Sequence, residues 1–255
     1  VVHEPYLAWS LHPIHLAGAL VHRLMLVIAA FNATRLWITI PAWAHAVRGY
    51  VTRRTPVRWL PVPSPFPVTH DDDAVNAMRH AIVTNGQSLV GHFGSYSPLV
   101  TRLLAPALDC VLERESVRVV LMGHGGRAFA DDFLSHRPQF AGRVVATGRL
   151  DASALSLQIQ TCDAMLQPYP DGVSSRRTTM VALLAHGKAI VTNDGDLTDD
   201  VWRTSGAVTL VSSPDPVALG DAMRALLDDR KQQTRLGDAA TRLYDRLFDV
   251  RHAIA

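Results

Sequence analysis

Residues 162–193 read CDAMLQPYPDGVSSRRTTMVALLAHGKAIVTN, and this stretch decides the fold class. A short apolar segment (164–166) precedes a polar loop, and an apolar helical segment (178–186) precedes a second short apolar segment (189–192). Strands that are apolar almost throughout, alternating with helices, are typical of a parallel sheet covered on both faces. Gly187 suits the cap that ends the helix. The stretch therefore predicts an α/β protein.

The same alternation continues on both sides of this stretch. We expect further strands at 88–91, 117–122, 143–147 and 207–211, and helices at 99–112, 128–135, 153–162, 216–229 and 231–247. An open parallel sheet of this kind binds ligands at the carboxyl ends of its strands. The loops that follow the strands are therefore the candidate binding loops.

The amino-terminal part predicts a second, incomplete α/β unit. Its expected strands are 1–3, 35–40 and 57–62, and its expected helices are 15–31 and 43–50. A joint with prolines at alternate positions, PVPSPFP at 61–67, separates the two parts, because proline removes the donors that a helix or sheet needs. Val1-Val2-His3 resembles the end of a buried strand, so we interpret the chain as a fragment that lacks an upstream part.

Composition gives expectations about partners, compartment and membrane insertion. The net charge is only +2, which gives no general argument for nucleic-acid binding. Cys110 and Cys162 lie in apolar helical contexts and are expected to be buried free thiols, which suits a reducing, cytoplasmic compartment. The most apolar stretch, 24–31, is too short to span a bilayer.

Two glycine-rich loops follow predicted strands. GHFGSYSP at 91–98 and MGHGG at 122–126 bring glycines beside a helix start, where the backbone can approach an anion closely. The residues that they offer to a ligand are Gly91, Gly94, Ser95, Gly123 and His124. Either loop can equally be an ordinary tight turn, and a loop histidine is as often simply exposed to solvent.

The loop after residue 166 is the densest in polar groups. It offers an acidic turn, hydroxyl groups and two adjacent cations: Asp171, Gly172, Ser174, Ser175, Arg176, Arg177, Thr178 and Thr179. We expect the hydroxyls to cap the helix, and the guanidinium groups and helix dipole to bind a diphosphate. The alternative is an ordinary capped helix start with solvated arginines.

From about residue 86 to 255, the chain resembles the donor-binding domain of the retaining glycosyltransferases of family 4, which have the GT-B fold. The motifs that carry the resemblance, in order, are VGHFG (90–94), LMGHG (121–125), ATGRL (146–150), TCDAMLQP (161–168) and LLAHGKAIVT (183–192). The resemblance implies two Rossmann-like domains. Residues 1–67 would be the end of a truncated acceptor-binding domain, 68–85 a linker and helix, 86–240 the donor-binding domain, and 241–255 a helix crossing back to the first domain.

The resemblance also implies partners and roles for particular residues. The donor would be a nucleotide-diphosphate sugar, and the acceptor a sugar, lipid or small molecule, with no further cofactor. Asp171 would hold the donor-sugar hydroxyls, His3 of a His-Glu-Pro motif would lie near the acceptor, and Arg149 and Leu150 near the base. No metal is required where arginines and a helix terminus face the diphosphate. Asp71-Asp72-Asp73 is interpreted as an acidic helix start rather than a metal site.

The sequence departs from the family pattern in ways that leave alternatives open. Of the usual two glutamates, Asp171 replaces the first, and either Thr179 or Ala182 stands at the second position, depending on the alignment. The first glycine-rich loop lacks the family's arginine and lysine, and we expect Arg176 and Arg177 to replace them from the opposite side of the crevice. The alternative functions are a non-catalytic nucleotide-sugar-binding scaffold and a nucleotide-sugar epimerase.

Contact with a membrane is a further question. The stretch 12–58 mixes histidine, arginine and tryptophan with apolar residues, which could suit a lipid-borne acceptor at the inner face of the membrane. Core helices with solvated edges are the favoured alternative.

Overall fold

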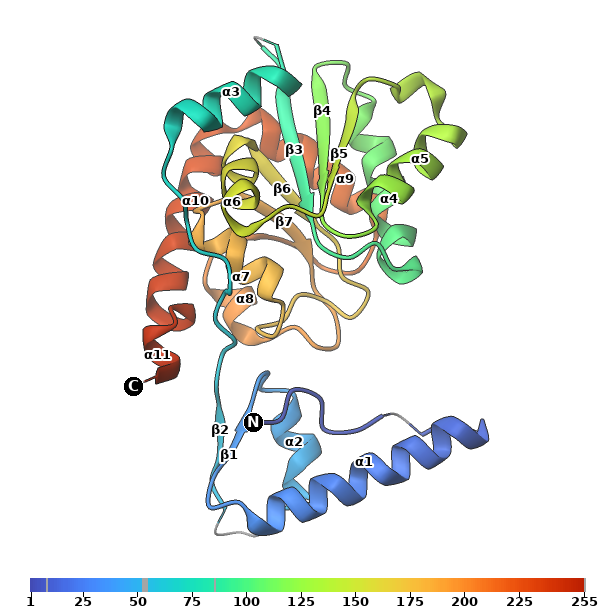
Figure 1. The fold of residues 1–255 in the computed structure, drawn as a ribbon, viewed down its shortest axis with the longest axis vertical. Helices are drawn as coiled ribbons and strands as arrows, with labels where there is room; N and C mark the ends of the chain where they lie inside the picture. Colours follow the sequence, from blue (N-terminus) through green and yellow to red (C-terminus); the bar gives the residue numbers. More distant parts are fainter. Residues whose placement is uncertain (8, 52–54, 85, 255) are drawn as a thin grey trace.

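The computed structural model describes residues 1–7, 9–51, 55–84 and 86–254, which form a larger and a smaller unit (Figure 1). The strands of the larger unit are β3 (Ser88–Phe93), β4 (Val117–Met122), β5 (Val144–Gly148), β6 (Ala164–Gln167), β7 (Ile190–Asn193) and β8 (Thr209–Val211). Its helices are α3 (Asp72–Ile82), α4 (Pro98–Leu112), α5 (Gly126–His136), α6 (Ala152–Thr161), α7 (Thr178–Ala185), α8 (Asp200–Thr204), α9 (Pro216–Asp228), α10 (Arg230–Leu243) and α11 (Arg251–Ile254). A 3₁₀ turn, η1 (Pro138–Phe140), and a π turn, η2 (Tyr244–Phe248), complete it.

The strands of the larger unit form one parallel sheet in the order β5-β4-β3-β6-β7-β8. This confirms the predicted α/β class, and each expected strand lies within three residues of its predicted bounds. The strand order reverses between β3 and β6, which are neighbours in the sheet although they are separated in the sequence. The loops that leave their carboxyl ends therefore lie side by side, which is the usual ligand site of such a sheet.

Alternating residues of the strands feed two hydrophobic cores. Val119 and Leu121 of β4 join the core shared with α4, α5 and α9, and Val120 and Met122 join the core shared with α6, α7 and α10. Successive side chains of a strand point to opposite faces, so strands covered on both faces must be apolar throughout. The near-continuous apolar runs in the sequence have this cause.

Several smaller predictions are confirmed, and others are corrected. Asp71 caps α3 by accepting a hydrogen bond from the Ala74 amide at 2.9 Å, with the next two aspartates in the first turn, as predicted for an acidic helix start. Both cysteines are free, but Cys110 is only half-buried, with its Sγ 3.3 Å from an oxygen of Asp221. The helix predicted over 231–247 turns into the π turn η2 at Tyr244. The short helix α8 was not predicted.

The smaller unit contains α1 (Pro13–Asn32), β1 (Leu36–Ile38), α2 (Trp43–Arg48) and β2 (Val57–Trp59). Strands β1 and β2 are parallel, and Val2 forms a parallel bridge to Ile38 on the other side of β1. The predicted helices and the two later strands of this part are thus confirmed, although these strands are shorter than expected. The strand expected at 1–3 is reduced to the single bridge of Val2. Residue 85, in the predicted linker, and residue 255, at the predicted crossover, lie outside the described residues.

Helix α1 of the smaller unit is longer than the apolar stretch singled out in the sequence. Helix α1 has 20 residues and a mean hydropathy of 1.8, so it is long and apolar enough to cross a membrane by length and composition. The uninterrupted apolar stretch within it covers only residues 24–31. Glycine, two histidines and one arginine interrupt the rest of the helix, but they are too few to make it polar on average.

Candidate functional site

Two adjacent cavities lie where β3 and β6 end. The larger, of about 810 Å³, is lined by Phe66, Phe93, Gly94, Gly123, His124, Arg149, Leu150, Asp151, Ala152, Leu155 and Thr179. The smaller, of about 260 Å³, is lined by His92, Phe93, Gly94, Ser95, Val100, Gln167, Pro168, Tyr169, Arg176, Arg177, Thr178 and Thr179. Phe93, Gly94 and Thr179 line both cavities, so they mark the boundary between them. Most of the predicted site residues thus come together here.

The two predicted glycine loops contact each other. Gly123 has a φ of +117°, and a Cβ atom added to it would lie 2.4 Å from the carbonyl oxygen of Gly94. No side chain fits at this position without displacing the neighbouring backbone. Gly91 has another role than predicted. It lies inside β3, and its Cβ would lie 2.6 Å from the sulfur of Met165, so it permits packing beneath the sheet and does not line either cavity.

The acidic loop between β6 and α7 is held together by ion pairs. The Asp171 carboxylate is paired with Arg177 and, at 2.9 Å, with Arg176. The Arg177 guanidinium also lies over the Tyr169 ring, 4.8 Å from its centroid. The two arginines are therefore clustered as predicted, but the carboxylate between them neutralises part of their charge.

The hydroxyls of this loop do not cap the helix as predicted. The residue before α7 is Arg177, which makes no side-chain capping bond. Ser174 Oγ is buried without a partner among the described residues. Ser175 is buried at the contact between the units, where its Oγ donates to the carbonyl of Thr39 at 3.0 Å and accepts from Trp59 Nε1 at 3.2 Å. Ser175 therefore fixes the position of the loop, and neither serine lines the two cavities.

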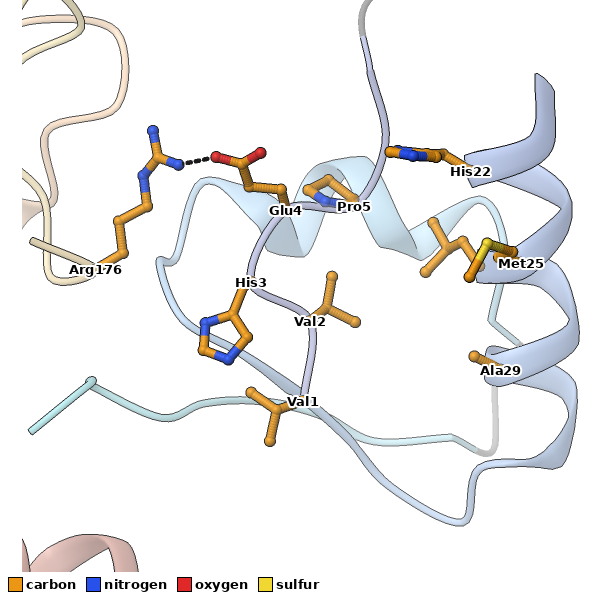
Figure 2. Close-up of a pocket in the computed structure, with 10 residues that line it drawn as sticks. Val1, Val2, His3, Glu4, Pro5, His22, Met25, Ala29 and Arg176 are labelled. Atoms are coloured by element: carbon orange, nitrogen blue, oxygen red, sulfur yellow. Dashed lines mark hydrogen bonds and ion pairs between the residues drawn. The ribbon is translucent and has the colours of Figure 1, made fainter. Parts of the chain in front are cut away.

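Arg176 connects the two units. Besides Asp171, it pairs with Glu4 of the smaller unit, and its guanidinium lies 6.0 Å from the ring centroid of Trp43. Glu4 is next to the predicted catalytic His3, whose backbone carbonyl accepts from Trp43 Nε1 at 2.8 Å. The acceptor-side motif and the polar loop thus meet at one arginine (Figure 2).

A third cavity, of about 640 Å³, lies on the smaller-unit side of this contact. It is lined by Val1, Val2, His3, Glu4, Pro5, His22, Met25, Leu26, Ala29 and Arg176. Figure 2 shows residues 1–5 on one side and the side chains of α1 on the other. The lining is apolar except near Glu4, the histidines and Arg176. His3 therefore lies beside a cavity that reaches the polar loop.

The loop after β7 supports the site and was missed in the sequence. Asn193 exchanges two hydrogen bonds with the backbone of Tyr169, at 2.8 and 2.7 Å. Asp199 accepts from the Ser175 amide at 2.6 Å, and burial raises the pKa of this carboxyl. Gly195 packs against the backbone of Asp171. A Cβ atom added to Gly195 would lie 2.6 Å from the carbonyl carbon of Asp171. The sequence Asn-Asp-Gly at 193–195, directly after the predicted strand 189–192, is typical of a turn and could have indicated this loop.

Thr179 and Ala182, the two candidates for the position of the second family acid, differ in their surroundings. Ala182 is fully buried in the core beneath α7, whereas Thr179 lines both cavities. The Thr179 hydroxyl lies 3.0 Å from the Tyr169 hydroxyl. Thr179 is therefore the residue of this pair that can reach a ligand.

His92 is a buried polar group that faces the smaller cavity. Its Nδ1 lies 2.9 Å from the carbonyl oxygen of Leu166, which can only accept, so the neutral ring carries its proton on Nδ1. Nε2 has no partner among the described residues, and the same holds for the side-chain amide of buried Gln167. Burial lowers the pKa of His92 to about 4. The ring is therefore neutral at neutral pH, and its acceptor nitrogen Nε2 is buried beside the smaller cavity.

We expect His92 to make the protein less stable in acid. Between pH 6.5 and about 4 the unfolded chain binds a proton at this residue and the folded chain does not. Stability should thus fall across this window as the pH falls, by roughly 3 kcal/mol in total. In urea titrations across the window, His92→Gln should flatten the profile relative to the wild type. His45→Gln, at an exposed position of α2, is the matched control.

Comparisons with known proteins identify the fold. No protein-family model matches the sequence, and no curated protein matches it significantly. A sucrose-phosphate synthase from Thermosynechococcus elongatus superposes with a TM-score of 0.72 at 15% identity, covering 92% of this chain and 59% of that one. HepE from Anabaena in complex with UDP gives 0.73 at 19% identity, covering 98% and 68%. An α,α-trehalose-phosphate synthase (UDP-forming) from Burkholderia vietnamiensis gives 0.69 at 14% identity, covering 98% and 62%.

These similarities establish the fold and no more. The chain has the GT-B fold of glycosyltransferases, as the sequence resemblance implied. It spans between 59% and 68% of the length of the three similar structures.

Proposed function

We propose that this protein transfers a sugar from a nucleotide-diphosphate-sugar donor to an acceptor. The observation that carries the proposal is the position of two arginines and Thr179 around two adjoining cavities at the point where the strand order reverses. Such a crevice in a GT-B fold is suited to a nucleotide joined to a diphosphate. HepE has been solved with UDP and with UDP-glucose, which supports a donor of this class.

The two cavities divide the donor between them. The larger cavity combines apolar walls, Phe66 and Leu155, with the predicted base-side residues Arg149 and Leu150, so it suits a nucleoside. The smaller cavity is more polar and contains the arginine pair, so it suits the diphosphate and sugar. Thr179 borders both, at the position where ribose and diphosphate would join.

Donor binding would exchange one set of ion pairs for another. Before binding, Asp171 and Glu4 balance Arg176 and Arg177. A diphosphate carries more charge than a carboxylate and offers several acceptor oxygens to each guanidinium group. Its arrival would release Asp171 from the arginines, and the freed carboxylate could then accept hydrogen bonds from the donor-sugar hydroxyls.

The chemical step would depend on electrostatic stabilisation. As the anomeric bond breaks, negative charge builds on the leaving diphosphate, and prearranged cations lower the energy of that state. Arg176, Arg177 and the amino terminus of α7 supply positive charge at this point. We propose that this charge replaces a divalent metal and that transfer occurs with retention, the latter on the sequence resemblance alone.

A thermal-shift panel of nucleoside diphosphates and their sugars, on the full-length protein, tests the donor site. At a concentration 100 times its Kd, the matching nucleotide should stabilise the fold by about 2.7 kcal/mol. The corresponding nucleoside monophosphate, which lacks the second phosphate, is the control and should give a smaller shift. Absence of a shift with every nucleoside diphosphate would contradict the donor site.

Asp171→Ala separates an enzyme from a binding scaffold. For a transferase, the substitution should abolish sugar transfer while nucleotide binding persists, because the carboxylate contacts the sugar and not the nucleotide. Transfer is measured as release of the nucleoside diphosphate in the presence of acceptors. Nucleotide binding without any turnover in the wild-type full-length protein would favour the scaffold, which the missing second acid of the family pattern also suggests.

A further inference from the structure

Helix α1 exposes an unusual amount of apolar surface. The structure describes every residue of this helix, and only Ala19, Leu26 and Ala30 are buried. Large apolar side chains on the rest of the helix are half or more exposed: Ile14, Leu20, Val21, Leu24, Met25, Ile28 and Phe31, from 53% at Leu20 to 80% at Phe31. A surface helix of a soluble protein normally carries one apolar stripe, so a helix that is apolar all round needs a second apolar environment.

The single charged side chain of α1 is screened from that surface. The Arg23 guanidinium is sandwiched by aromatic rings, 4.1 Å from the centroid of Tyr6 and 3.9 Å from that of Trp9. It also donates to the carbonyls of Leu7 and Ala19, each at 3.0 Å. Its charge is therefore engaged within the protein, beneath a tryptophan that is itself 59% exposed.

Charge is distributed unevenly between the two parts of the sequence. Residues 1–70 contain five arginines besides the engaged Arg23 and a single acid, Glu4, whereas residues 71–255 contain 19 basic and 22 acidic residues. Four of the five tryptophans also lie in the first 59 residues. A basic region with exposed apolar side chains and tryptophan is complementary to a lipid bilayer that carries negative charge, where aromatic rings occupy the interface.

Helix α1 is placed to lie along such a surface rather than to cross it. Leu26 packs into the core of the smaller unit with Leu36, Ile38 and Val47, and Ala30 of the next turn is also buried. Crossing the bilayer would require the helix to leave this core. A helix that lies flat on the bilayer leaves this core intact. Its opposite, exposed face is then buried at the boundary between the lipid headgroups and the acyl chains.

We infer that the smaller unit docks through α1 on an anionic lipid bilayer and takes its acceptor from that surface. The second part rests on the proposed function. Met25 both belongs to the exposed face and lines the 640 Å³ cavity, which ends at Glu4 and Arg176. An acceptor with an apolar chain and a hydroxylated headgroup would thus keep its chain beside α1 and place its hydroxyl near the donor site (Figure 2).

Co-sedimentation of the full-length protein with lipid vesicles tests the docking. Vesicles of phosphatidylcholine with phosphatidylglycerol should bind it more tightly than phosphatidylcholine alone, and added salt should reduce the difference. The double substitution Leu24→Glu/Ile28→Glu should weaken binding roughly 100-fold, because both side chains leave the acyl boundary. Leu99→Glu changes a leucine that is equally exposed, at 61%, on α4 of the larger unit, and should have no effect.

A labelling experiment avoids dependence on a variant that fails to fold. In a Cys110→Ser background, an environment-sensitive fluorophore on Ile28→Cys should shift to the blue when anionic vesicles are added, and one on Val217→Cys should not. A label at residue 28 that is already shifted without lipid would show that protein covers this face, and would overturn the inference. Equal vesicle binding by wild type and the double variant would also overturn it.

Nucleotide binding provides a separate readout. The thermal shift with nucleoside diphosphates should be the same in the double variant and the wild type, since α1 lies outside both donor cavities. Loss of vesicle binding with retained nucleotide binding supports the docking, whereas failure of nucleotide binding in the wild type overturns the proposed function and leaves the vesicle result standing.

Discussion

Replacing both Arg176 and Arg177 with glutamine is expected to lower the rate of sugar transfer by about a thousandfold. The two guanidinium groups line the smaller donor cavity, and no other lysine or arginine lines it among the described residues. Without them the leaving diphosphate would develop its charge next to Asp171, a carboxylate that the same substitutions leave unpaired. Steady-state release of the nucleoside diphosphate, with saturating donor, measures the effect.

The control for this prediction is an arginine with a similar ion pair away from the site. Arg114 pairs with Asp228 at 2.5 Å on the surface of the larger unit, so Arg114→Gln removes one ion pair and should leave the transfer rate unchanged. The single variants should also differ. Arg176→Gln breaks the contact with Glu4 of the smaller unit as well, so it should affect acceptor KM in addition to kcat. A double variant within tenfold of wild type would show that the cations act elsewhere.

Gly172→Ala is expected to reduce the free energy of unfolding by about 4 kcal/mol, the largest effect that we predict on stability. Gly172 has a φ of +82°, and its Cβ would lie 2.2 Å from Thr198 Oγ1 and 2.5 Å from the amide nitrogen of Gly195. The loop bearing Asp171 would have to move away from the loop after β7, which holds it in place. Urea-induced unfolding measures the stability, and the donor thermal shift should fall with it.

A second glycine isolates the packing contribution. Gly206 has a φ of +66°, but a Cβ there would meet no atom within 4 Å. Gly206→Ala therefore carries only the backbone strain of a positive φ, about 1 kcal/mol. If both variants lose the same stability, the close approach of the two loops is not what requires glycine at position 172.

Much of the larger unit could be predicted because its strands and helices are encoded locally. The strand 117–122 has the bounds expected from its apolar run, and α4 begins one residue before its predicted start, at a proline suited to a first helical turn. The candidate loops followed from the same pattern, since parallel strands align their carboxyl ends at one edge of the sheet. The sequence alone could therefore predict that Arg176 and Arg177 lie close to Gly94 and Thr179.

Other features depend on residues far apart in the sequence. Ser175 suits a helix cap by its local sequence, but Thr39, 136 residues away, accepts its hydrogen bond. Gly91 resembles a loop glycine, but the register of β3 against β6 places it over Met165. Neither outcome can be inferred from spacing, because each is decided by which surfaces the fold brings together.

The sequence by itself determined a parallel α/β sheet, the loops at its carboxyl edge and the arginine pair suited to a diphosphate. Only the tertiary structure decided that Thr179 rather than Ala182 faces the cavities, that Glu4 and Asp171 share Arg176, and that α1 keeps most of its apolar surface exposed. The reason is physical. Periodicity records which side chains avoid water, whereas the partner that each side chain meets depends on packing between distant segments.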